Sequence, residues 1–112
     1  MGMTAFKARP LSLFQGSAGD ENHSEPFDLG DASEVHVQTK LIATTQQLTI
    51  SYQKSIDGLH WSSATQLVQS SSPTVDVDSI TSDIYRFIRF QYVFTTTGKA
   101  TFEIDVYAKN HS

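Results

Sequence analysis

Residues 85–108 read YRFIRFQYVFTTTGKATFEIDVYA, and this stretch decides the fold. Its first half is dense in aromatic and β-branched residues, and residues 100–108 alternate strictly between apolar and polar. Successive side chains of a β-strand point to opposite faces, so the alternation predicts a strand that is buried on one side. The predicted outer face carries Tyr107. The predicted core positions are Phe102, Ile104 and Val106.

The same period of two extends upstream to Val35. Further alternating or apolar runs occur at 35–43, 48–53, 66–68 and 74–77. Turn-forming residues separate these runs, and Asp57-Gly58 is typical of a reversal between antiparallel strands. No window shows a convincing helical period. The sequence therefore predicts an all-β fold, a single antiparallel β-sandwich or jelly roll of about seven or eight strands.

The length of 112 residues corresponds to one domain with one core. Because there is no cysteine, neither a disulfide nor a thiolate metal site is expected, which fits a reducing compartment. The first residues lack the apolar segment of a secretory signal, and no stretch approaches the ~20 apolar residues of a membrane helix. We therefore expect no export by a visible signal and no membrane partner.

The net charge of −4 is unevenly distributed, since residues 20–34 are strongly acidic and residues 35–112 are balanced. Without clustered Lys and Arg, nucleic-acid binding is not expected. Charged residues make up 18% of the chain, below the usual ~25%. This composition is compatible with an ordinary β-sheet surface or with a surface that meets protein partners, because interface cores are depleted of charge.

Two segments differ in character. Residues 1–26 are predicted to form an N-terminal arm and loop, since 16–26 is rich in turn formers and has no apolar period. Residues 27–112 are predicted to form the β-sandwich domain. A body already closed by the strands of 35–108 leaves the apolar residues of the arm unburied, so the arm is expected to reach a neighbouring subunit. The predicted interface residues are Leu11, Leu13, Phe14 and Tyr107.

Two motifs carry a resemblance. They are LTISYQKSIDGLHW at 48–61 and YRFIRF at 85–90. Together they resemble the strand, turn, Trp and Arg-flanked strand of discoidin-like (coagulation factor 5/8 type C) domains and related galactose-binding-like jelly rolls. The chain is also similar to small virion proteins of tailed bacteriophages, which serve as head-decoration or tail accessory parts. The resemblance covers about residues 27–109 and matches none of the ligand-binding loops, so it implies no sugar- or lipid-binding residue.

Catalytic chemistry is not indicated. The sequence contains no G-x-S-x-G elbow and no glycine-rich phosphate loop. The histidines have no spacing that requires convergence on a metal; they are His23, His36, His60 and His111. We therefore predict that the protein is not an enzyme and uses no cofactor.

A few residues are candidates for ligand binding. Asp76 and Asp78 share one strand face and, with Asp83, form a weak candidate metal site; the loop does not follow the EF-hand pattern. Trp61 is a candidate for stacking on a glycan, although its place after the Asp-Gly turn favours a role in covering the end of the core.

The resulting hypothesis is a structural virion protein, either a phage head-decoration (cement) or a tail-associated accessory subunit. Its expected partners are major capsid or tail subunits and further copies of itself, with a trimer as one option for the homo-oligomer. The expected location is the virion, assembled in the host cytoplasm. The alternative is a carbohydrate-binding module of the discoidin-like type.

Overall fold

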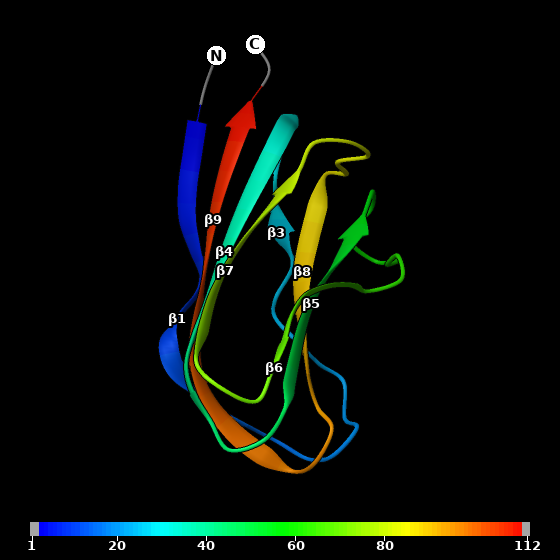
Figure 1. Ribbon diagram of the computed structural model, residues 1–112. Coiled ribbons are helices and arrows are strands. Elements are labelled where there is room, and N and C mark those ends of the chain that lie inside the picture. The colour runs from blue at the N-terminus through cyan, green and yellow to red at the C-terminus, as the bar shows by residue number, and fades with distance from the viewer. Residues whose placement is uncertain (1–2, 111–112) are drawn as a thin grey trace.

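The computed structural model describes residues 3–110, which form two antiparallel sheets packed face to face (Figure 1). The predicted all-β sandwich is confirmed. Nine strands occur in the described residues: β1 (Met3–Gly16), β2 (Asn22–His23), β3 (Phe27–Asp28), β4 (Ala32–Thr44), β5 (Leu48–Ser55), β6 (Thr65–Ser70), β7 (Thr74–Ile80), β8 (Phe87–Phe94) and β9 (Gly98–Asn110). Within residues 3–110, no helix is long and apolar enough to cross a lipid bilayer.

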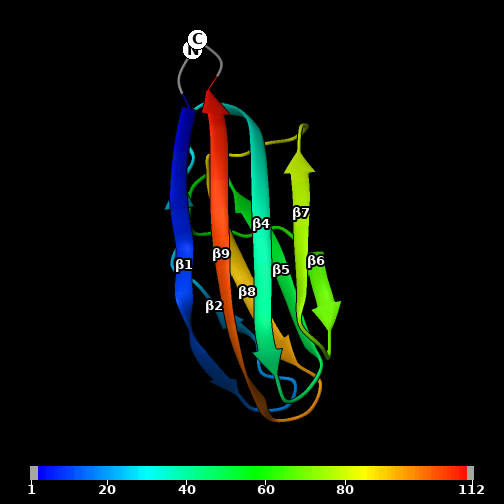
Figure 2. The same cartoon turned by 60° about the vertical axis from the view of Figure 1, so that its left-hand side comes forward.

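The two sheets are called A and B here. Sheet A has the strand order β1-β9-β4-β7 and is seen face-on in Figure 2. Sheet B has the order β2-β8-β5-β6, and β3 also pairs with β8. The molecule is elongated, 43 × 26 × 19 Å, because β1, β4 and β9 are long strands that run along its length.

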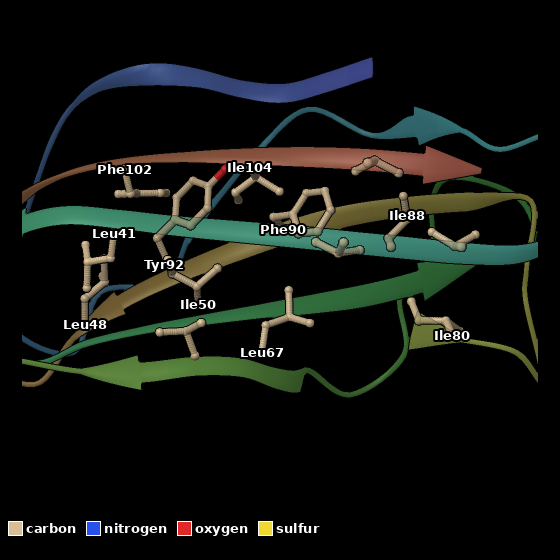
Figure 3. Close-up of a cluster of buried hydrophobic side chains, with 14 of the residues drawn as sticks. Leu41, Leu48, Ile50, Leu67, Ile80, Ile88, Phe90, Tyr92, Phe102 and Ile104 are labelled. Atoms are coloured by element: carbon tan, nitrogen blue, oxygen red, sulfur yellow. The ribbon is translucent and has the colours of Figure 1, made fainter. Parts of the chain in front are cut away.

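The core lies between the sheets, as Figure 3 shows. Phe102 and Ile104 of β9 and Leu41 of β4 point inward from sheet A, and Ile50 and Phe90 point inward from sheet B. All five are essentially inaccessible to solvent. The alternation read from β9 thus predicted the core correctly, since Val106 is buried as well. Burying each such side chain stabilises the fold by roughly 1.5–3 kcal/mol.

The N-terminal segment differs from the predicted arm. Strand β1 pairs with β9 along its length as an edge of sheet A, and β2 pairs with β8 as an edge of sheet B. The pairing of β1 shifts register between Lys7 and Arg9 and again between Arg9 and Ser12. These irregularities, next to Pro10, break the period of two, which is why the sequence pattern concealed the strand.

Side chains on the inner face of β1 also hold this strand against the core. The guanidinium carbon of Arg9 lies 4.4 Å from the ring centroid of Phe102 and 5.5 Å from that of Tyr92. The ring of Phe14 stacks on Phe94 at a centroid distance of 5.6 Å. Phe14 therefore packs against the core, so the premise that the body leaves it unburied is wrong, and its role at an interface stays a prediction.

Candidate interaction surface

Sheet A presents an unusual outer face. Its buried positions alternate with side chains that point away from sheet B, because paired residues of neighbouring strands share a face. Four of these are large, apolar and exposed: Leu13, Val75, Val77 and Tyr107. Leu11 and Ile42, which lie in the register shifts of β1 and β4 and have no paired residue, are large, apolar and exposed as well, and we include them. We call this surface the apolar face. It includes three of the four predicted interface residues, Leu11, Leu13 and Tyr107.

Paired charges occupy the middle of the apolar face. The Lys7 ammonium lies 2.8 Å from an Asp105 carboxylate oxygen and 3.1 Å from one of Glu103. Lys40 approaches the other Glu103 oxygen at 3.3 Å. The hydrogen bonds to Asp105 and then Glu103 raise the pKa of Lys7, and those from Lys7 and then Lys40 lower the pKa of Glu103. These two cations and two anions thus neutralise one another within the sheet.

A shallow depression of about 490 Å³ lies on the same face, near the start of β1 and the end of β9. Ala5, His36, Val77 and Tyr107 are among the residues that line it. The ring of His36 is held on both sides, since its Nδ1 lies 2.8 Å from the Ser79 hydroxyl and its Nε2 lies 2.7 Å from a Glu34 carboxylate oxygen. The depression therefore has a largely apolar lining, and the ionisable groups Lys7, His36 and Asp105 within it already have partners.

The loop of residues 56–64, which joins β5 to β6, lies over one end of the outer face of sheet B. Trp61 lies over the guanidinium of Arg89 with 4.5 Å between the guanidinium carbon and the ring centroid. Backbone and side-chain hydrogen bonds of Ser62 tie the loop to Lys54 and Gln53. Trp61 is thus half-buried on the outside of sheet B, and the prediction that it covers the end of the core is wrong.

The turn inside this loop follows from Asp57-Gly58. Gly58 has a φ of 78°, a region that strongly favours glycine. The Asp57 carboxylate accepts hydrogen bonds from the backbone amides of His60 and Leu59, at 2.9 and 2.8 Å, and contacts the His60 ring at 2.7 Å. These contacts, those from His60 foremost, hold the pKa of Asp57 well below its usual range. The loop is longer than the two-residue hairpin turn that Asp-Gly often forms, but it does reverse an antiparallel pair.

The acidic candidates lie elsewhere. Asp76 and Asp78 share the inner side of edge strand β7, opposite the buried positions Thr39 and Val37 of β4. A hydrogen bond that protonated Asp78 donates to the Asp76 carboxylate, together with burial, raises the pKa of Asp78 to about 6. Asp83 lies in the β7–β8 loop with a φ of 52°. Among the described residues, no three acidic, histidine or cysteine side chains are grouped so as to hold a metal ion.

The other histidines do not converge. His23 lies in β2, His36 on the apolar face and His60 in the β5–β6 loop. His111 lies outside the described residues.

Sequence reasoning missed Ile42, Val75 and Val77. The β7 sequence Thr-Val-Asp-Val-Asp reads as apolar inside and acidic outside, yet the valines point outward. On β4, the register shifts between Leu41 and Ala43. From the shift onward, side chains point to the face opposite to the one that the period of two predicts. Edge strands often carry inward-pointing charged residues, which protect them from pairing with another chain. Only this general tendency could have indicated that the carboxylates of β7 point inward.

The comparisons with known proteins find similarity in structure but not in sequence families. No protein-family model and no curated protein matches the sequence. The PBSX exported protein XepA superposes with a TM-score of 0.66 and 18% identity over 97% of this chain. This chain spans 38% of the length of XepA.

Two smaller proteins match over nearly their whole length. The SPBc2 prophage-derived protein YomS gives a TM-score of 0.57 and 12% identity, with 96% of this chain and 92% of YomS covered. A carbohydrate-binding module of Cellvibrio mixtus lichenase 5A, solved with cellotriose, gives 0.51 and 11%, with 96% and 98% covered. At these identities the likeness shows a shared fold.

Proposed function

We propose that this chain is a structural subunit of a phage particle, a head-decoration or tail-associated accessory protein that works by protein–protein contacts. The observation that carries the proposal is the apolar face, where large apolar side chains remain exposed around charges that already pair with one another. Patches of this kind on soluble proteins mark sites of interaction. The proposed partners are other virion proteins, such as major capsid or tail subunits.

Two further observations support the proposal. The fold is shared with the PBSX exported protein XepA and with the SPBc2 prophage-derived protein YomS. The depressions lined by Gln15, by Tyr107 and by Trp61 are shallow and open, unlike the deep cleft with converging ionisable groups that catalysis would favour. Both observations favour a surface that binds other proteins over a reaction centre.

The proposal is tested on particles. Phage particles from the source strain are purified on a density gradient, and their protein content is measured by quantitative mass spectrometry. We expect this chain at a fixed copy number per particle, and its absence from intact particles would contradict the proposal. Ile42→Asp, which places a charge on the apolar face, should reduce incorporation, whereas Thr96→Asp in the exposed β8–β9 loop should not.

A carbohydrate-binding module is the second candidate, and one feature favours it. Trp61 and Tyr85 border a shallow depression of about 360 Å³ that also includes Asp57 and His60. Aromatic rings beside polar groups can stack on a sugar and hydrogen-bond its hydroxyls. A glycan array tests this function: binding that is lost in a folded Trp61→Ala variant supports it, and no binding by the intact protein excludes it for the glycans on the array.

A further inference from the structure

Two exposed apolar features lie on opposite sides of the molecule. The depression lies on the outer face of sheet A, and the β5–β6 loop lies on the outer face of sheet B. Figure 1 shows this loop on the side opposite β1 and β9. In the first half of this loop, Ile56 and Leu59 are 73% and 78% exposed. We call these two side chains the apolar knob.

The apolar knob is presented by an ordered loop. Asp57, which lies between the two apolar residues, binds the backbone amides of Leu59 and His60. The Ser55 hydroxyl accepts a further hydrogen bond from the Gly58 amide at 2.8 Å. Because the chain is already fixed at this turn, inserting the knob into a partner costs little additional conformational entropy.

The depression has matching properties. It is large enough for two aliphatic side chains, and Val77, Ala5 and Tyr107 give its lining an apolar character. The charged groups at its rim, Lys7 and Asp105, lie 2.8 Å apart. Covering the depression therefore leaves neither of these two charges without a partner, which is the main cost of burying charge.

We propose that the apolar knob of one copy of this chain binds in the depression of the next copy. A second copy is the favoured occupant because the same chain carries both halves of the contact, one on each side. A contact between two different surfaces is heterologous and continues into a closed ring or a filament. The inference deepens the proposed function, on which it rests, by naming the partner of the apolar face.

The test uses single variants and their mixture. Val77→Asp places a charge in the depression, and Leu59→Asp places one on the knob. Sedimentation velocity of the full chain should show an assembly larger than a dimer, and each variant alone should be monomeric. An equimolar mixture should form a one-to-one dimer, since Val77→Asp keeps an intact knob and Leu59→Asp keeps an intact depression.

Val75→Asp is the matched control. Val75 lies on the same strand and face as Val77 and is 59% exposed against 62%, but it does not line the depression. This variant should keep the assembly. Circular dichroism checks that each variant is folded, and Val77→Ser and Leu59→Ser replace any that is not.

Several results would overturn the inference. They are a monomeric parent protein, an assembly that survives Leu59→Asp or Val77→Asp, a mixture that forms no dimer, and an equal loss with Val75→Asp. A protein that is found in particles but is monomeric in solution would overturn this contact alone and leave the proposed function standing.

Discussion

The outer faces of the two sheets differ in what covers them. On sheet B, the β5–β6 loop folds back so that Trp61 stacks on Arg89, and a Cβ at Gly58 would lie only 3.6 Å from the ring of Phe87. On sheet A, the side chains of the apolar face remain exposed. The sandwich thus covers one end of the outer face of sheet B with its own chain and leaves the apolar face of sheet A exposed.

The size of the open face fits a protein partner. Three strands of 13 or 14 residues and one of 7, about 4.8 Å apart, give a face of roughly 700 Å². One side of a standard protein–protein interface buries about 800 Å². Since the charges in its middle are already paired, a partner could cover most of this face without leaving them isolated.

The largest expected effect is on the free energy of unfolding, and it distinguishes the inner face of β1 from its outer face. Phe14→Ala should lower the free energy of unfolding by about 2–3 kcal/mol, because the ring packs on Phe94 and against the core. Leu13→Ala, one residue away on the apolar face, should change it by less than about 0.5 kcal/mol. Urea unfolding followed by circular dichroism measures both. Equal effects would show that β1 does not hold this register in solution.

Strand β9 was predictable from the sequence and β1 was not, for a physical reason. β9 has the long strands β1 and β4 on its two sides and one buried face, so its side chains alternate without interruption. β1 is an edge strand with two register shifts, and Arg9 turns inward onto aromatic rings. A period of two identifies central strands well, but it fails where bulges shift the phase.

The candidate surface was only partly predictable for a related reason. The sequence indicates Leu11 and Leu13 because nothing in the predicted body would bury them, and it indicates Tyr107 because residues 100–108 alternate. Val77 was hidden because β7 turns its carboxylates inward, which depends on the neighbouring sheet edge rather than on the local sequence. Such placement is a tertiary property that propensity and pattern do not determine.

The next largest effect concerns the covered face. Trp61→Ala should lower the free energy of unfolding by about 1–2 kcal/mol, since it removes the ring that stacks on Arg89 and helps hold the loop on sheet B. Leu59→Ala, in the same loop but almost fully exposed, is the control and should be neutral within about 0.5 kcal/mol. If Trp61→Ala were as neutral as its control, the claim that the loop covers sheet B would fail.

A smaller effect depends on pH and concerns the inner side of β7, opposite its exposed valines. The pKa of Asp78 is raised to about 6 from 3.8, so the folded protein holds this proton more tightly than the unfolded chain. The resulting stabilisation is fully present below about pH 4 and is lost as the pH rises through 6. Asp78→Asn should therefore stabilise the protein by about 1 kcal/mol at pH 8, after allowance for solvent screening, and have little effect at pH 4.

Chemical denaturation at both pH values measures this difference, and Asp83→Asn provides the control. It removes the same charge from the exposed β7–β8 loop, so it should not reproduce the pH-dependent gain. A gain of equal size at pH 4 and pH 8 would mean that Asp76 does not disfavour the ionised form of Asp78.

The smallest effect is expected at the centre of the apolar face. Lys7 pairs with Asp105 and Glu103, but its ammonium is exposed, and exposed ion pairs contribute little to stability. Lys7→Met should leave the urea midpoint unchanged within error, but it should weaken self-association, because Asp105 at the rim of the depression then loses its cation. Lys40→Met, at the other end of the same network, provides a second measurement. A clear loss of stability in either variant would show that the paired charges hold sheet A together, and the apolar face would then have to be explained as a surface that serves the fold.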